Sequence, residues 1–279
     1  MEKVDRLGWS VGTAIESYGV NVGIRSNDAG TLKRIQELLP GKWKPTNRRK
    51  VDRLYSFFTA SSNGHVGAKR AGRLYFDGFP VARTMSFERM HEAFDSNFRL
   101  FVAEFATHYV FVHAAAVGWK DRGIIIPGRS YSGKSTLVAE LVRAGATYYS
   151  DEYAVIDSRG RLHPFSKPIE LRRKDGSYKQ SKLHLDEIGG HAGTKPLPIK
   201  LVLMTRFKEG ATWRPRQVTS GKGVLELLSN TVSARRAPEK AFESLERVVA
   251  NADVLVGPRG ETEDAVPAIL KRLEKSISD

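Results

Sequence analysis

The sequence predicts an α/β fold in two domains, a small α+β domain over residues 1–98 and a larger domain over residues 99–279. Three observations support this prediction. Strand-like and helical patterns alternate along the chain. A glycine-rich loop lies between an apolar strand-like segment and a helical segment in the second half. The 279 residues suffice for one domain of ordinary size and a smaller one.

The composition is that of a folded protein, with 41% hydrophobic and 27% charged residues. The chain has no cysteine, which excludes disulfides, thiolate metal sites and cysteine nucleophiles. Four of the first six residues are charged, where a signal peptide needs an apolar stretch, and no run approaches the roughly 18 apolar residues of a membrane span. We therefore expect a cytoplasmic protein without a membrane partner.

The net charge of +14 raises the question of nucleic-acid binding. Residues 1–98 hold 16 basic and 10 acidic groups, and residues 99–279 hold 29 and 21, so the excess is +6 and +8. Because both parts of the chain carry a similar positive excess, neither is a basic tail of the kind that binds nucleic acid. Nucleic-acid binding stays an alternative and not the first expectation.

In the first domain, hydrophobic periodicity predicts a strand over 18–24, a helix over 31–39 and strands over 54–59 and 73–76. A second helix is expected to begin after Ser86, whose hydroxyl can cap it. Apolar residues follow at spacings of three and four, which predicts that they face the core. They are Phe87, Met90, Phe94, Phe98, Phe101 and Phe105.

In the second domain, buried strands are expected on both sides of the glycine-rich loop, followed by further strands and two late helices. The expected strands are 109–117, 124–126, 148–152, 154–157 and 199–205, and the expected helices are 136–144, 239–250 and 263–276.

The segment Gly128–Ser135 matches the phosphate-loop motif G-x-x-x-x-G-K-[ST], with a strand before it and a helix after it. Its glycines let successive amides point at an anion beside a helix N-terminus. Lys134 brings a charge to the terminal phosphates, and Ser135 offers a hydroxyl to Mg²⁺. The motif predicts ATP with Mg²⁺ as ligand. The residues expected to bind it are Gly128, Arg129, Ser130, Tyr131, Ser132, Gly133, Lys134, Ser135 and Thr136.

An acidic pair, Asp151 and Glu152, follows the next expected strand, where the sheet can bring it beside the loop. Phosphoryl transfer to an alcohol needs a base for the acceptor and a carboxylate for the metal. The alternative is a solvated surface pair.

Four segments occur in a specific order along the chain. They are His113-Ala-Ala-Ala-Val, Ile126-Pro-Gly-Arg-Ser-Tyr-Ser-Gly-Lys-Ser-Thr, Ser150-Asp-Glu and His163-Pro-Phe-Ser-Lys-Pro. This order resembles the catalytic domain of HPr kinase/phosphorylase and the shorter kinases related to it, themselves akin to phosphoenolpyruvate carboxykinase. The resemblance covers about residues 109–172, with a weaker likeness at 230–236. It implies a P-loop kinase domain of the HPr kinase/carboxykinase type.

The resemblance also implies roles for single residues. Asp151 matches the general base, and Lys134 is the lysine of the phosphate loop. His113 matches a histidine near the active site, although a lone histidine on an apolar strand is also typical of a core. Glu152 stands where the family commonly has Asp, so we expect it to bind the metal together with Ser135 or to support the base. No segment matches the one linked with phosphorolysis in the bifunctional enzymes, so reversal of the kinase reaction is not predicted. The first domain does not resemble theirs, so their hexameric assembly is not predicted either.

Two basic segments are candidates for binding the acceptor. One is 172–182, expected to be a mobile loop and containing Arg172, Arg173 and Lys174, and the other holds Arg235 and Arg236. The alternative for both segments is that their charged side chains face solvent and bind no ligand. A third cluster surrounds Trp43. It consists of Lys42, Lys44, Arg48, Arg49, Lys50 and Arg53.

Three function classes follow from these features. The first is a kinase acting on a hydroxyl, such as a serine of a protein or of a ribosomally made peptide precursor. The second is a small-molecule kinase. The third is an ATP-binding switch associated with a partner or with nucleic acid. Asp151 discriminates among them, because a switch needs no acceptor base. A homo-oligomer is possible in each class.

Overall fold

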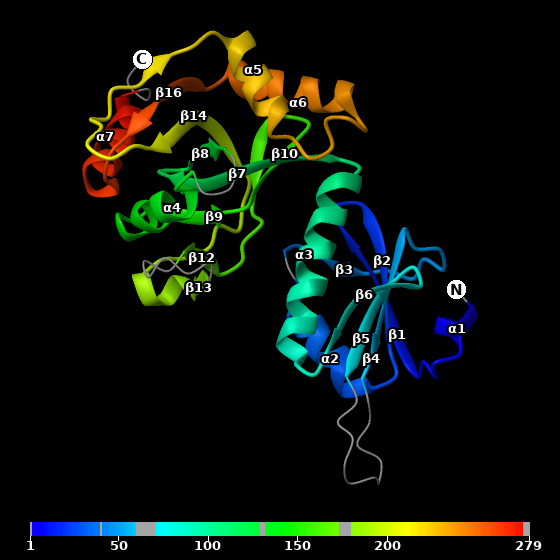
Figure 1. The fold of residues 1–279 in the computed structure, drawn as a ribbon. Helices are drawn as coiled ribbons and strands as arrows, with labels where there is room; N and C mark the ends of the chain where they lie inside the picture. The colour runs from blue at the N-terminus through cyan, green and yellow to red at the C-terminus, as the bar shows by residue number, and fades with distance from the viewer. Residues whose placement is uncertain (1, 40, 60–70, 129–131, 173–179, 276–279) are drawn as a thin grey trace. The chain divides into compact units, whose positions relative to one another are not determined.

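The computed structural model is a mixed α/β fold with several sheets, as the sequence predicts (Figure 1). The described residues are 2–39, 41–59, 71–128, 132–172 and 180–275.

The chain forms two compact units, residues 1–107 and 108–279. The boundary expected between residues 98 and 99 falls inside a single helix, α3 (Phe87–Phe105). That boundary is wrong because the apolar stripe of α3 continues past it, with Phe101 and Val102 buried in the last turns.

The first unit is built on a six-stranded sheet in the order β3-β1-β2-β4-β5-β6, in which only β2 and β4 pair in parallel. Besides α3, its elements are α1 (Glu2–Asp5), β1 (Val11–Ser17), β2 (Val20–Ser26), α2 (Ala29–Glu37), β3 (Lys44–Pro45), β4 (Arg53–Phe58), β5 (Gly72–Phe76) and β6 (Phe79–Thr84). The ring of Phe94 on α3 packs edge-on against Tyr55 and Phe57 of β4, with centroids 5.0 and 5.2 Å apart. Ser86 accepts a hydrogen bond from the Arg89 amide at 3.3 Å and so caps α3 as expected.

The second unit is built on an eight-stranded mixed sheet in the order β11-β10-β7-β8-β14-β16-β15, with β9 also paired to β7. Its elements are β7 (Tyr109–Trp119), β8 (Arg122–Pro127), α4 (Lys134–Arg143), β9 (Thr147–Ser150), β10 (Tyr153–Asp157), β11 (Arg161–His163), β12 (Ile169–Arg172), β13 (Gln180–Leu183), η1 (Leu185–Ile188), β14 (Leu197–Phe207), β15 (Arg216–Gln217), α5 (Ser220–Ser229), α6 (Pro238–Ala250), β16 (Asp253–Arg259) and α7 (Thr262–Lys275).

Helices α4 and α7 pack on one face of this sheet, and α5 and α6 pack on the other (Figure 1). The three strands β8, β14 and β16 run in parallel, so their carboxyl ends meet at one edge. In α/β proteins, ligands commonly bind at the carboxyl ends of the parallel strands. The phosphate-loop motif begins there, directly after β8.

Several expectations differ from the structure. Residues 18 and 19 form the turn between β1 and β2, because Tyr18 and Gly19 both have positive φ. The expected loop 172–182 is wrong at both ends: Arg172 pairs with Gln180 across a hairpin of β12 and β13, whose backbone groups hydrogen-bond to each other. Residues 173–179 lie outside the described residues. The strand expected over 148–152 ends at Ser150, so the acidic pair lies in the turn that follows.

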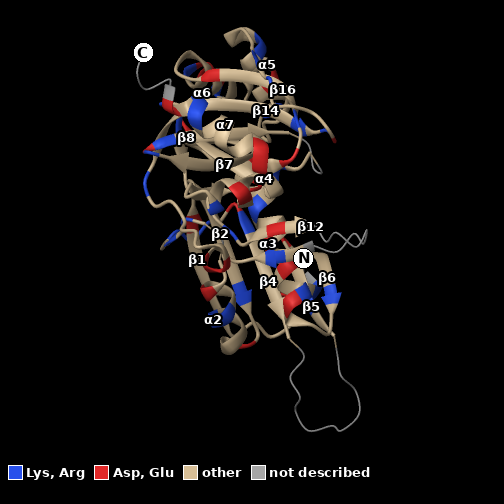
Figure 2. Ribbon diagram, turned by 90° about the vertical axis from the view of Figure 1, so that its left-hand side faces the viewer, with Lys and Arg blue, Asp and Glu red and all other residues tan. Residues whose placement is uncertain are grey.

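Basic residues are distributed over the elements of both units, as the division of charge along the sequence indicates (Figure 2). A search of the described helices for a segment of membrane-spanning length and hydropathy found none.

Candidate active site

The two motif glycines lie where other side chains approach the backbone closely. Gly133 caps α4 with φ +85°, a left-handed conformation that favours glycine. A Cβ at Gly133 would stand 2.6 Å from Nη2 of Arg259, and one at Gly128 would stand 3.0 Å from Oγ of Ser132. Of the predicted nucleotide-binding residues, Arg129, Ser130 and Tyr131 lie outside the described residues.

The side chains of Lys134 and Ser135 point from the first turn of α4 toward the carboxyl end of the sheet. Nζ of Lys134 donates to the carbonyl of Gly128 at 2.7 Å, and the residue is only 7% exposed. This burial lowers the pKa of Lys134 to about 8, against the opposing effect of the Asp151 carboxylate. The Ser135 hydroxyl donates to Oδ2 of Asp151 at 3.2 Å, and Thr136 follows in the same turn.

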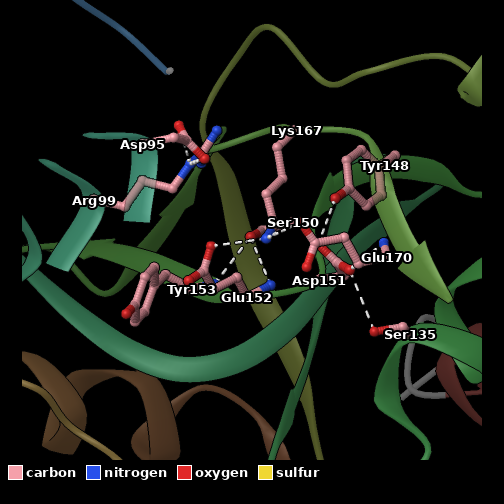
Figure 3. Close-up of polar contacts among 10 residues, drawn as sticks. All are labelled: Asp95, Arg99, Ser135, Tyr148, Ser150, Asp151, Glu152, Tyr153, Lys167 and Glu170. Atoms are coloured by element: carbon pink, nitrogen blue, oxygen red, sulfur yellow. Dashed lines mark hydrogen bonds and ion pairs between the residues drawn. The ribbon is translucent and has the colours of Figure 1, made fainter. Parts of the chain in front are cut away.

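Asp151 is buried and accepts three hydrogen bonds (Figure 3). Oδ1 accepts from the Tyr148 hydroxyl at 3.0 Å. Oδ2 accepts from Ser135 and, at 3.1 Å, from the amide of Glu170. These donors come from β9, α4 and β12, and they fix the orientation of the carboxylate. The structure thus brings together Lys134, Ser135 and Asp151, which the sequence singled out separately.

Glu152 lies in an ion-pair group beside Asp151 (Figure 3). Nζ of Lys167 is 3.2 Å from Oε2 of Glu152 and 3.3 Å from Oε1 of Glu170. Burial alone would lower the pKa of Lys167, but the carboxylates of Glu152, Asp151 and Glu170 together raise it. The Ser150 hydroxyl accepts from the amide of Glu152 at 3.1 Å, which shapes the turn that presents the pair. A charged lysine therefore neutralises part of the acidic group.

His113 lies on β7, half-buried, on the wall of a cavity of about 850 Å³ that reaches Gly128 and Ser132. Burial lowers the pKa of His113, and the charge of Lys134 lowers it further. The imidazole is therefore neutral at pH 7. The His113 amide donates to the Asn230 carbonyl at 2.7 Å, which ties the segment after α5 to the sheet.

Arg259, at the end of β16, is a site residue that the sequence reasoning missed. Its guanidinium is 2% exposed and donates to the carbonyls of Gly133 at 2.8 Å and Gly260 at 3.1 Å. Burial lowers the pKa of Arg259, and the nearby Glu261 raises it. The only sequence signal for Arg259 is a charged residue at the end of an apolar strand-like segment. No local pattern marks Tyr148, Lys167 or Glu170.

The basic candidates for acceptor binding are spread over different elements. Arg172 ends β12, the strand whose Glu170 amide donates to Asp151, while Arg173 and Lys174 lie outside the described residues. Arg235 and Arg236 are exposed in the turns before α6. The search for three or more His, Asp or Glu side chains able to hold a metal ion found none within the described part of the chain.

Comparison with models of known protein families found no match to this chain. Comparison with curated proteins found no significant match either. The function is therefore inferred from the motifs and the geometry of the site.

Proposed function

We propose that this protein is an ATP-dependent phosphotransferase of the HPr kinase-related P-loop type, which transfers the γ-phosphoryl group to a hydroxyl. The observation that carries the proposal is the hydrogen bond from Ser135 to Asp151, formed beside the buried Lys134. It joins a hydroxyl suited to Mg²⁺, a carboxylate suited to proton transfer and a cation suited to phosphate.

The residues present fit a nucleoside triphosphate with its metal. The Ser132 hydroxyl oxygen is buried and has no hydrogen-bond partner among the described residues. Burial disfavours the charge of Lys134, and a phosphate would favour it again. An anion bound on the loop would therefore give the Ser132 hydroxyl a partner and stabilise the charged form of Lys134. When bound, Mg²⁺·ATP would supply the phosphoryl group, the metal would neutralise part of the phosphate charge, and Ser135 would be the residue that holds the metal.

The chain's own residues orient the acceptor and move its proton. Asp151 takes the proton of the acceptor hydroxyl at one of its carboxylate oxygens, and the carboxylate is held in place by Tyr148 at Oδ1 and by the Glu170 amide at Oδ2. Lys167 offsets the charge of the neighbouring carboxylates, which limits their repulsion of the phosphates. Neutral His113 can hydrogen-bond to a ligand in the cavity without adding a charge.

We propose a serine of a protein or peptide as the acceptor. Support comes from β12, which carries Glu170 beside the base and ends two residues later at Arg172, with Arg173 and Lys174 next in the sequence. Basic residues at this point of the chain can hold an acidic or extended acceptor chain. Neutralising the three residues is expected to raise the KM for the acceptor and to leave ATP binding unchanged. With ATP as the donor, the proposed site of action is the cytoplasm.

The variant Asp151→Asn tests the phosphotransferase. We expect it to bind Mg²⁺·ATP nearly as the wild type does and to transfer phosphoryl about 10²–10⁴-fold more slowly, because a positioned base contributes that much. The measurement is label transfer from γ-labelled ATP to a library of serine peptides and to water. Asp121→Asn, at a side chain 76% exposed, is the matched control. Transfer by Asp151→Asn at the wild-type rate would show that Asp151 is not the base.

A further inference from the structure

The positive charge of the first unit is concentrated in one segment, residues 42–50. This basic segment holds five basic residues and no acidic one, so it carries +5 of the +6 excess of residues 1–98. The other residues in that range hold 11 basic and 10 acidic groups, which nearly balance each other. The proposed phosphoryl transfer assigns the segment no role. Its basic residues are Lys42, Lys44, Arg48, Arg49 and Lys50.

The charges of the basic segment are open to solvent. All five basic residues are exposed. Lys44 forms an ion pair with Glu16 of β1, with 3.1 Å between Nζ and Oε1. The other four form neither an ion pair nor a side-chain hydrogen bond with any described residue. Because like charges this close in sequence repel one another, binding of an anionic partner would be favourable here.

The backbone of the basic segment is held in place by the sheet of the first unit. The segment contains β3, which pairs with β1 at the edge of that sheet. The Ser17 hydroxyl donates to the carbonyl of Lys42 at 3.0 Å, and the Thr46 amide donates to a carbonyl of β1 at 3.0 Å. Just beyond the segment, the Asp52 amide donates to the Asn21 carbonyl at 2.7 Å, and the Asn21 amide donates to Oδ2 of Asp52 at 2.8 Å. A partner would therefore not have to order this backbone, which lowers the entropic cost of binding.

The structure of the basic segment favours an acidic polypeptide over a nucleic acid. Residues 42–50 contain a short strand and no helix, so the segment offers no helix to the major groove of a duplex. Proteins that bind single-stranded nucleic acid combine positive charge with aromatic rings on which the bases stack. The one aromatic residue of the segment, Trp43, is half-buried. An acidic polypeptide needs only carboxylates within reach of the cations, and the pair of Lys44 with Glu16 is a contact of this kind.

We propose that the basic segment 42–50 is a docking surface for an acidic stretch of a partner polypeptide. The identification of that partner as the phosphoryl acceptor rests on the proposed function, which takes the acceptor to be a protein or peptide. Docking at the segment would lower the KM of the acceptor without taking part in proton transfer.

Fluorescence anisotropy with a labelled oligoglutamate peptide tests the docking surface on the full-length protein. The wild type should bind the peptide, and its affinity should fall at least tenfold between about 50 and 300 mM salt, because salt screens exposed charges. The triple variant Arg48→Gln, Arg49→Gln, Lys50→Gln should bind about tenfold more weakly, since each exposed ion pair contributes a factor of about two to five.

A matched control removes the same charge from exposed residues of the first unit that lie outside the basic segment. The control substitutions are Lys33→Gln on α2, Arg83→Gln on β6 and Arg89→Gln on α3. Because these side chains form no ion pair with the described residues, the control should fold normally and keep the affinity of the wild type for the peptide. Equal weakening in the two triple variants would show that net charge alone attracts the peptide, and the inference would be wrong.

An oligothymidylate of the same length separates the two kinds of anionic polymer. The wild type should bind it more weakly than oligoglutamate, because the segment has no fully exposed aromatic ring for the bases. Tighter binding of the oligonucleotide, lost in the Arg48, Arg49 and Lys50 variant, would assign the segment to nucleic acid and overturn the inference. Absence of saturable binding of the peptide would overturn it as well.

Phosphoryl transfer distinguishes a failure of this inference from a failure of the proposed function. A serine peptide is compared with the same peptide carrying an oligoglutamate stretch. In the wild type the stretch should lower KM about tenfold and leave kcat unchanged. The triple variant in the segment should lose this gain and keep its KM for the plain peptide and its Kd for ATP. Transfer with a KM that the stretch does not change would contradict docking of the acceptor and leave the proposed function standing. Specific peptide binding without transfer to any serine would contradict the proposed function and leave the docking surface standing.

Discussion

Raising the pH from 7 to 9 should weaken nucleotide binding, because it removes the charge of Lys134. The buried ammonium has a pKa of about 8, well below the ordinary lysine value of 10.5. The phosphates of the nucleotide, with a last pKa of about 6, stay fully ionised over this range. His113 stays neutral, because its pKa is lowered below its ordinary value of 6.5. Lys134 is therefore the site group expected to change charge.

The size of the effect follows from this pKa. If only the charged form binds phosphate, the apparent Kd is proportional to 1 + 10^(pH − 8), which rises about tenfold between pH 7 and pH 9. The stability of the ligand-free protein moves in the opposite direction. Since the pKa of Lys134 is lower in the folded state than in the unfolded state, the unfolded chain holds more protons between about pH 8 and 10.5. The contribution of Lys134 to stability therefore rises with pH by about 3 kcal/mol across this window.

The assay is calorimetric titration with Mg²⁺·ATP at pH 7, 8 and 9 in buffers of different ionisation enthalpy, which also gives the proton uptake on binding. Lys134→Arg is the control, because arginine keeps its charge throughout and should give a flat profile. An equally flat wild-type profile without proton uptake would refute the assignment of a low pKa to Lys134 or its contact with phosphate.

Two further predictions concern stability, measured by urea denaturation. Gly133→Ala should lower the free energy of unfolding by about 2–3 kcal/mol, because it adds a clash with Arg259 to the cost of a positive φ. Gly210→Ala, at φ +69° in open space, should lose only about 1 kcal/mol, and equal losses would show that the clash is absent. Lys167→Met should cost about 2 kcal/mol, because it leaves two carboxylates without their shared cation. Lys195→Met, in an exposed ion pair, should cost less than about 0.5 kcal/mol, and a similar loss at both lysines would contradict the reasoning.

Local patterns predicted the parts of the fold that local chemistry determines. The Ser86 cap, the helix after it and the strand and helix around the phosphate loop all lie close to their expected positions. The strand Val11–Ser17 was missed because only part of its length is apolar. Helix α5 was missed because Gly221 and Gly223 lower helix propensity, although Gly223 packs closely against Val254, where an added Cβ would stand 3.0 Å from Cγ2.

The candidate site was predictable only where a motif marks it. Lys134, Ser135 and Asp151 follow from the motif and its strand order. Arg259 meets Gly133 across 126 positions of sequence, and this contact depends on the parallel pairing of β14 with β16. Lys167 shows the same dependence on tertiary structure, because its two carboxylate partners come from different elements. Such contacts depend on the order of the strands in the sheet, and a short stretch of sequence carries no information about that order.

The most direct test of ATP binding at the phosphate loop is the Kd of Mg²⁺·ATP for the wild type and for Lys134→Ala at pH 7, with circular dichroism to verify that both are folded. Removing a buried charged partner of a phosphate costs about 2 kcal/mol or more, so the folded variant should bind at least about 30-fold more weakly. Equal affinity of the two folded proteins would contradict the assignment of residues 128–135 as the nucleotide site.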